Sequence, residues 1–298
     1  MERIGELVSF GTAICWTLGA VFFEQGIKRI GVLPVNFFKL AIAIVLLTIT
    51  AGFTRGMPIP VDAPFQTVIV LSISGIVGFV IADMFLFSAY GTVGPRIAML
   101  FMALCPPITA GMARIFLGES IGARGWLGMS LVIIGIGMTV FGKQNNKSIF
   151  KISREDKRGY IFACIAPICQ SAGMVLTKFG LGDYNPVSGT QIREFAGIIG
   201  FGLVSLIYNR GKDLAKAVKN TGGMKFTAAG AFFAPFLGVT LSLFALQLAS
   251  AGIVSTFIGL TPVLILAPEI LVFKKKLNPM EIAGAFVAVL GTAIFFLW

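Results

Sequence analysis

An acidic residue inside an apolar segment is the strongest candidate for chemistry in this sequence. Asp83 lies within the third apolar segment. Three aromatic residues share its helix face, at successive spacings of four, four and three: Phe79, Phe87 and Tyr90. A charged carboxylate facing lipid costs about 2.5–3.5 kcal/mol, so we expect this face to point into a helix bundle. There Asp83 would titrate a proton or orient a substrate in an aromatic-lined cavity. The alternative is a structural role, as an ion pair with Lys39 or a hydrogen bond between helices.

Prolines interrupt two other apolar segments at matching places. Pro106 and Pro107 lie in the fourth segment, and Pro262 lies in the ninth. A proline lacks an amide proton and frees the carbonyl four residues earlier, such as that of Met102, so each helix should open near the middle of the bilayer. Such openings favour a nearby substrate site, with Met102 beside it. A kink that serves packing alone is an equal alternative.

Further polar and aromatic side chains at similar depth are candidates for lining the same site: Trp16, Gln170, Thr240, Phe244 and Gln247. Trp16 and Gln170 occupy equivalent positions of an internal repeat, which favours a shared cavity. An aromatic residue in a span is nevertheless more often part of the core.

Several ionisable residues in or near apolar segments are candidates for coupling or gating: Asp83, Glu24, Lys39, Lys178, Arg193, Glu194 and Glu269. Groups near the ends of spans can reach the interface or pair across helices. We expect Glu24 to pair with Lys39, and Glu194 to pair with Lys178.

The elements that position these residues are long apolar segments. Of 298 residues, 56% are hydrophobic and 12% are charged, and the mean hydropathy is +0.91, which excludes a water-soluble globule. We expect an all-α polytopic membrane protein. At about 20 residues per crossing, the sequence predicts ten spans: 6–26, 34–52, 66–89, 97–117, 124–142, 159–180, 187–208, 225–248, 253–273 and 279–298.

The two halves of the chain repeat. A shift of 154 residues places Lys39 on Arg193, and later a shift of 156 places Pro106 on Pro262. The predicted units are a first five-helix repeat, a polar linker and a second five-helix repeat: 1–142, 143–158 and 159–298. Because five is odd, the second half should enter the membrane upside down. The sequence therefore predicts two inverted five-helix repeats, the usual basis of alternating access.

Glycines seven residues apart recur in both halves. Seven residues are nearly two helical turns, so each pair predicts a smooth stripe where a neighbouring backbone packs closely. The pairs are Gly19 and Gly26, Gly173 and Gly180, Gly128 and Gly135, and Gly284 and Gly291.

Composition also excludes several classes of function. The absence of histidine excludes the usual zinc sites and histidine-based triads, and no Walker A sequence occurs. The four cysteines lie inside apolar segments without a C-x-x-C pair. We expect no enzymatic activity, no cofactor and no metal. The net charge of +11 comes from cations in short loops, which indicates membrane orientation and not nucleic-acid binding.

Several motifs point to one family. The chain contains G-x-x-x-A-D-x-x-L-F-x-A, G-P-R-I-A-M-L, P-P-I-T-A and F-L-G-E-S-I followed by W-L-G, and its second half contains G-I-V-S-T-F-I-G-L-T-P-V-L-I-L. These motifs, over essentially the whole chain, resemble the EamA-type branch of the drug/metabolite transporter superfamily. The resemblance implies a ten-helix transporter of small metabolites, often outward and commonly in exchange for protons. Two positions depart from the pattern: Lys274 to Lys276 replace the Gly118-Glu119-Ser120 stretch, and Lys39 stands where relatives often have arginine.

The leading hypothesis is a secondary transporter of small polar or amphipathic metabolites, amino-acid-like or drug-like, that works by alternating access and exports its substrate. The alternatives are a non-transporting receptor or assembly factor and, less favoured, an intramembrane enzyme. We expect the plasma (inner) membrane of a prokaryote, a small-molecule substrate, contact with the lipid bilayer, no nucleic-acid partner, and a monomer or homodimer.

Charge and symmetry predict the orientation and the position of the cavity. One side of the predicted topology carries 17 of the 24 Lys and Arg residues, including those of the linker 143–158, so that side should be cytoplasmic and both termini outside. The substrate cavity should lie between the halves at mid-depth, lined by spans one, three, four, six, eight and nine. Spans five and ten should pack at the periphery.

Overall fold

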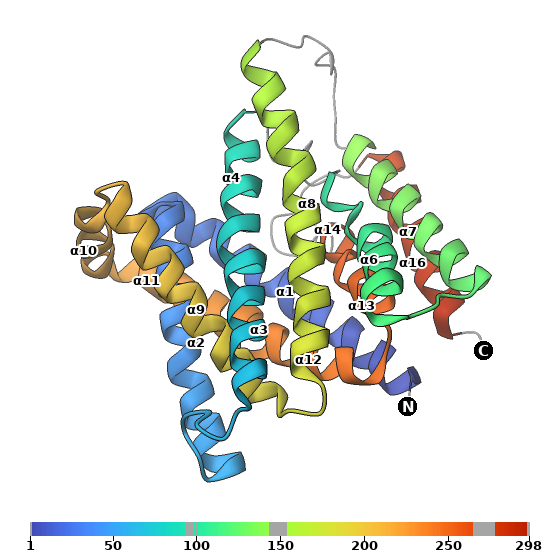
Figure 1. Ribbon diagram of the computed structural model, residues 1–298. Helices are drawn as coiled ribbons and strands as arrows, with labels where there is room; N and C mark the ends of the chain where they lie inside the picture. Colours follow the sequence, from blue (N-terminus) through green and yellow to red (C-terminus); the bar gives the residue numbers. More distant parts are fainter. Residues whose placement is uncertain (1, 93–97, 99–100, 143–153, 265–277, 297–298) are drawn as a thin grey trace.

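The computed structural model describes residues 2–92, 98, 101–142, 154–264 and 278–296. Within these ranges the chain forms helices joined by short connections, and no strand occurs (Figure 1). Six of the described helices are long and apolar enough to cross a membrane, and two shorter apolar helices cover 123–138 and 279–294. The prediction of an all-α chain with membrane-crossing segments is therefore confirmed.

The helices of the first half are α1 (Glu2–Ile30), α2 (Val32–Arg55), α3 (Phe65–Gly75), η1 (Ile76–Ile81), α4 (Ala82–Thr92), α6 (Cys105–Leu117) and α7 (Ala123–Gly142). Those of the second half are α8 (Arg154–Leu181), α9 (Pro186–Ile207), α10 (Gly211–Lys219), α11 (Thr221–Ala231), η2 (Phe232–Gly238), α12 (Val239–Leu248), α13 (Ala251–Ile258), α14 (Thr261–Leu264) and α16 (Pro279–Phe296).

Local sequence explains where several of these helices begin and end. Asn185 caps α9 by accepting hydrogen bonds from the amides of Val187 and Ser188, and Pro186 occupies the first turn, where its missing amide proton has no cost. At the other end of a span, α2 stops at Gly56, whose φ of 69° is left-handed and favours glycine.

Two π-helical segments lie at equivalent places of the repeat. Segment η1 connects α3 to α4, and η2 connects α11 to α12, so each widens the third long helix of its half. The shift of 156 residues that relates the prolines also places Ile76 on Phe232, the first residues of the two segments. Such bulges often occur at functional sites. Here η1 ends two residues before Asp83.

Two helices are interrupted at equivalent positions. The helical conformation stops at Ala103 and Leu104 before α6, and again at Gly259 and Leu260 between α13 and α14. Prolines follow both interruptions, and Pro106 approaches Gly259, so the two openings face each other. The helices are therefore open where the prolines predict, while their role beside a substrate stays a prediction.

Close glycine contacts hold the halves together. A β-carbon on Gly173 of α8 would lie 2.9 Å from the Cα atom of Gly78 in η1, and one on Gly19 of α1 would overlap the side chain of Ala234 in η2. The repeat shifts relate these two contacts, so the first helix of each half packs on the third helix of the other half. Figure 1 shows α8 beside α3 and α4.

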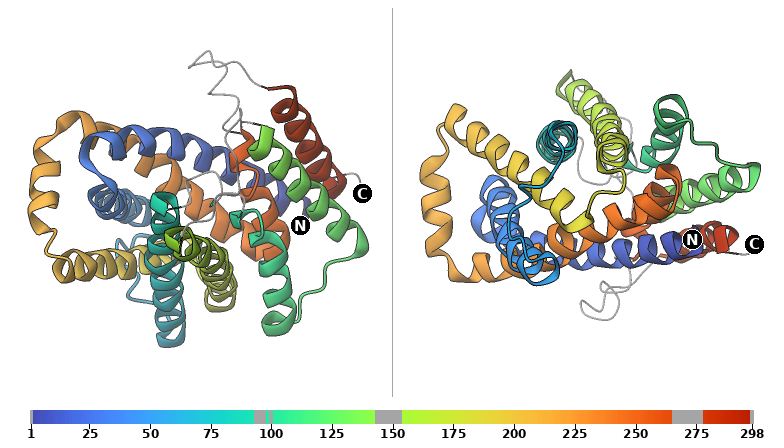
Figure 2. Two further views of the ribbon diagram at one scale, coloured as in Figure 1. Left: turned by 90° about the horizontal axis from the view of Figure 1, so that it is seen from above. Right: turned by 60° about the horizontal axis from the view of Figure 1, so that its bottom comes forward.

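The glycine stripes of α7 and α16 face each other. A β-carbon on Gly291 would lie 2.8 Å from the amide nitrogen of Val132 and 2.9 Å from the carbonyl oxygen of Gly128. Figure 2 shows α7 and α16 side by side at one end of the molecule. The prediction that these glycines serve close helix packing is confirmed.

We expect Gly173→Ala to destabilise the protein, because its methyl group would push α8 away from η1. Overpacking of this kind costs about 1–3 kcal/mol. The matched control is Gly111→Ala in α6, where a β-carbon would meet nothing within 4 Å; the better helix propensity of alanine should leave that variant neutral or slightly more stable. Thermal midpoints in detergent compare the two, and equal midpoints would contradict the interlocked packing.

Candidate substrate site

The centre of the candidate site is an ion pair between two long helices of the first half. The Nζ atom of Lys39 on α2 lies 3.2 Å from Oδ2 of Asp83 on α4. The two side chains are 12% and 20% exposed, so both charges are largely removed from solvent. The ion pair that the sequence offers as the structural alternative for Asp83 is therefore present. A pair this enclosed depends on both partners, because either charge alone would be uncompensated.

A second pair of ionisable residues comes from the other half. Arg193 on α9 is the repeat counterpart of Lys39, and its guanidinium carbon lies 4.6 Å from the centre of the Phe79 ring. Gly78 lies beside it, since a β-carbon there would be in ordinary contact with Nη2 of Arg193, at 3.4 Å. Glu194 is 0% exposed, and neither carboxylate oxygen has a hydrogen-bond partner among the described residues. The cations whose charges act on Glu194 are Arg193 and Lys39.

Aromatic side chains surround these charges. The ring centre of Phe23 lies 5.7 Å from Nζ of Lys39. Trp16 packs against the core cluster that contains Phe79, and its indole nitrogen is buried with no hydrogen-bond partner in the described part of the chain. A β-carbon on Gly238, the last residue of η2, would lie 3.3 Å from that nitrogen. Charged and aromatic side chains from both halves therefore lie close together here, and contact with a substrate stays a prediction.

Other predicted lining residues are used elsewhere or lie apart. Gln170 and Met102 are half-buried, and no described contact joins Gln170 to Trp16. The hydroxyl of Thr240 donates to the carbonyl of Phe236 at 2.6 Å, and Phe244 is 41% exposed. Substrate contact by these four residues stays a prediction.

The side chain of Gln247 is used in a helix connection, and its contact with substrate stays a prediction. Gln247 lies one residue before the end of α12, and its amide donates to the carbonyls of Gly182 and Tyr184 at 2.8 and 2.9 Å. Its donors therefore fasten the connection between α8 and α9.

Four predicted positions fall partly or wholly outside the described residues. Phe87 and Tyr90 lie on α4 and Pro262 lies on α14, but the structure does not describe their side chains. Glu269 lies outside the described residues.

The two ion pairs expected for Glu24 and Glu194 are wrong. Glu24 pairs with Lys28 one turn along α1, at 2.6 Å and in an exposed position. Lys178 pairs with Glu119, at 2.5 Å. In each case a nearer partner was available, since Lys28 follows Glu24 by four residues and the end of α6 packs beside α8.

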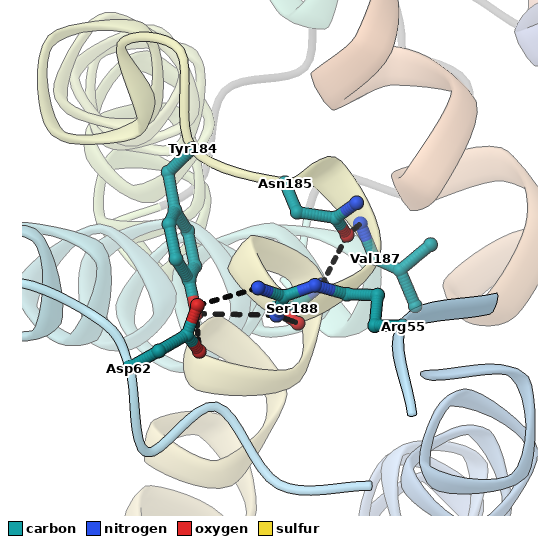
Figure 3. Close-up of polar contacts among 6 residues, drawn as sticks. All are labelled: Arg55, Asp62, Tyr184, Asn185, Val187 and Ser188. Carbon is teal, nitrogen blue, oxygen red and sulfur yellow. Dashed lines mark hydrogen bonds and ion pairs between the residues drawn. The ribbon is translucent and has the colours of Figure 1, made fainter. Parts of the chain in front are cut away.

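A polar network that was not predicted from the sequence joins α2 to α9. Nη2 of Arg55 lies 2.5 Å from Oδ2 of Asp62, while Nη1 donates to Ser188 and, at 3.5 Å, to the Tyr184 hydroxyl. Tyr184 in turn donates to Oδ1 of Asp62 at 3.0 Å (Figure 3). The hydrogen bond from Arg55 lowers the pKa of Asp62, and burial raises the pKa of Tyr184.

A second network lies beside it. Lys178 donates to the carbonyl of Ala249 at 2.5 Å, and Glu119 accepts a hydrogen bond from the amide of Ala251 at 2.9 Å. Gln247 connects this network to the Tyr184 loop. We call the two networks together the Arg55 closure, because they join the helix ends on that side of the bundle. The sequence signal for it was Glu119, the glutamate that only the first repeat retains.

The chain is similar to known proteins in both sequence and fold. The model of the EamA-like transporter family matches residues 3–141 and 157–297. A solved structure described only as the crystal structure of a protein superposes with a TM-score of 0.77, at 16% sequence identity, over 99% of this chain and 97% of that one. This likeness shows the fold alone. The comparison with curated proteins gives no match.

Breaking the central ion pair should cost more than breaking an exposed one. Lys39→Met leaves Asp83 without its cation and should lower the free energy of unfolding by about 3 kcal/mol. Combining Lys39→Met with Asp83→Asn should cost less than the sum of the single changes. The control is Lys28→Met, which removes the exposed pair with Glu24 and should cost about 1 kcal/mol or less. Strictly additive losses at Lys39 and Asp83 in equilibrium unfolding would contradict the pairing.

The Arg55 closure should weaken in acid. A carboxyl group whose pKa is lowered by folding stabilises the protein above its ordinary pKa, near 3.8 for Asp62, and loses that contribution as the pH falls through the folded value. Asp62→Asn should lower the thermal midpoint at neutral pH and remove this acid dependence. Asp183→Asn, in the adjacent loop and exposed, is the matched control. Indistinguishable pH profiles of the two variants would refute the contribution of Asp62.

Proposed function

Because the chain belongs to the EamA-like transporter family, we propose that it is a secondary transporter of small polar or amphipathic metabolites, amino-acid-like or drug-like. It is an integral membrane protein. In the proposal it exports its substrate by alternating access across the plasma (inner) membrane of a prokaryote, as a monomer or homodimer. Its ten membrane helices form two inverted five-helix repeats, 1–142 and 159–298, joined by the linker 143–158.

The observation that carries the proposal is the meeting of charged side chains from both halves. Lys39 and Asp83 come from the first half, and Arg193 and Glu194 come from the second. Intramembrane ionisable residues are rare and mark transport pathways by default. The π-helical segments and the interrupted helices occur at equivalent points of both repeats, as expected for a site at the junction of inverted repeats.

The Lys39–Asp83 pair supports a mechanism of competition. One carboxylate can be neutralised by the Lys39 ammonium, by a proton, or by a cationic group of a substrate. A substrate ammonium that replaces Lys39 at Asp83 leaves that lysine free, and a proton on Asp83 releases the substrate again. Substrate would in this way exchange for a proton, because Lys39, the substrate cation and the proton compete for the same carboxylate of Asp83.

The Arg55 closure supports alternating access. It fastens the loops on one side through ion pairs and backbone hydrogen bonds, which can open and close as units. The positive-inside rule places the opposite side, which bears most of the Lys and Arg residues, in the cytoplasm. The closed side then faces outward, and an exporter would accept its substrate from the cytoplasm in this conformation.

Labelling of single cysteines tests the orientation. In a cysteine-free background we expect Asp183→Cys, on the Arg55 side, to react with an impermeant maleimide added to intact cells. Lys219→Cys, at the end of α10, should react only after the cells are permeabilised. The reverse pattern would place the Arg55 closure in the cytoplasm.

Counterflow in proteoliposomes tests the function. A panel of radiolabelled amino-acid-like and drug-like metabolites should contain compounds that exchange across the membrane, whereas a receptor or assembly factor would exchange none. Asp83→Asn keeps the shape and hydrogen bonding of the side chain but removes its charge, so it should reduce exchange at least about tenfold or abolish its pH dependence.

The control is Val287→Ile in α16, which should exchange at the wild-type rate because that helix packs at the periphery. If Asp83→Asn exchanges normally from about pH 5 to pH 8, the carboxylate has only a structural role.

A further inference from the structure

A hollow of about 620 Å³ lies at the end of the bundle opposite the Arg55 closure. Its walls are the turn between α1 and α2, the end of α9 and the short helix α10. Since α2 runs from this hollow to Arg55, the two features lie at opposite ends of one membrane-spanning helix. The hollow is therefore distinct from the central ion pair.

The charge in the hollow is positive. Three cations and one acid line it: Arg29, Arg210, Lys216 and Asp213. Arg210 is paired with Asp213 at 3.1 Å. Arg29 is held in place by the carbonyl of Gln25, at 2.7 Å, and by the ring of Phe226, at 4.4 Å, neither of which carries a negative charge. Lys216 has no ion pair within the part of the chain that the structure describes. Two cations are thus available to an anion.

The other wall of the hollow is apolar and continues into the lipid-facing surface. Val32, Leu33 and Val204 line it. Ile207, three residues beyond Val204 and next to it on the same side of α9, is 77% exposed. An exposed apolar side chain at the end of a helix of membrane-spanning length suits contact with an acyl chain. A ligand in the hollow would therefore meet cations on one side and apolar surface on the other.

Helix α10 has the pattern of a helix that lies in the membrane interface. Its apolar residues Leu214 and Val218 share one face, and Lys212, Lys216 and Lys219 share the opposite one, while Ala217 is buried in the protein beside the hollow. Such helices bury the apolar face at the headgroup boundary and attract anionic lipids through the lysines. The hollow therefore opens at the depth of the phospholipid headgroups.

We propose that this hollow binds the phosphate headgroup of an anionic phospholipid. Arg29 and Lys216 contact the phosphate, and an acyl chain follows the apolar end of α9. Basic pockets between membrane helices on the cytoplasmic side suit such headgroups. Inorganic phosphate shares the charge but not the chain, so the apolar wall favours the lipid. The assignment does not depend on what the protein transports.

Direct binding of short-chain lipids tests the proposal. Purified full-length protein in detergent is titrated with dioctanoyl phosphatidylglycerol, dioctanoyl phosphatidylcholine or inorganic phosphate, and bound molecules are counted by native mass spectrometry. Phosphatidylglycerol should bind at least about fivefold more tightly than the other two probes. Lys216→Gln and Arg29→Gln should each weaken its binding by about fivefold, as expected for one cation near the membrane surface.

The matched control is Lys212→Gln, which removes the same charge from α10 outside the hollow and should leave the affinity within about twofold. Asp213→Asn, which removes the competing acid, should strengthen binding, and it keeps the test decisive should a cation variant prove unstable. Equal weakening by Lys212→Gln and Lys216→Gln would overturn the site in favour of diffuse surface charge. Equal affinity for inorganic phosphate would overturn the lipid assignment.

Discussion

Charge removed from water must be compensated, and this constraint governs the middle of the bundle. Lys39 and Asp83 satisfy each other within the first half, whereas the carboxylate oxygens of Glu194 have no hydrogen-bond partner among the described residues. The charge of Lys39 also acts on Glu194 of the second half. In the proposed mechanism, a cation that replaced Lys39 at Asp83 would change the charge that Lys39 presents to Glu194, and binding in one half would be felt by the other.

The close packing of the halves makes this coupling possible. Gly173 against Gly78 and Gly19 against Ala234 bring backbones together where larger residues would separate them. The same contacts lie at the π-helical segments, a form that occurs frequently at functional sites. Close backbone contact and departure from regular α-helix thus occur at the same level. Two arrangements of the halves about this level are the basis of the proposed alternating access.

The sequence predicted features that depend on composition and period. Apolar length predicted the spans, and the repeat shift predicted that Pro106 and Pro262 follow equivalent helix openings. It could not predict which side chains meet, because a helical period shows which residues share a face but not which helix lies opposite. Glu24 forms an ion pair with Lys28 on its own helix, and Lys178 forms one with Glu119. The network joins Arg55 and Asp62 to Tyr184, which lies 129 and 122 positions further along the chain, and no local pattern marks that contact.

A structure determined with a transported metabolite bound would show whether the Lys39–Asp83 pair is the centre of transport. We expect the ligand to lie between the halves, with a polar group within hydrogen-bond distance of Asp83 or Glu194 and an apolar part against Trp16 or Phe79. In that complex the distance from Lys39 to Asp83 should exceed the 3.2 Å of the present structure. A ligand bound away from these residues, with the Lys39–Asp83 pair intact, would contradict the claim that this pair is the centre of transport.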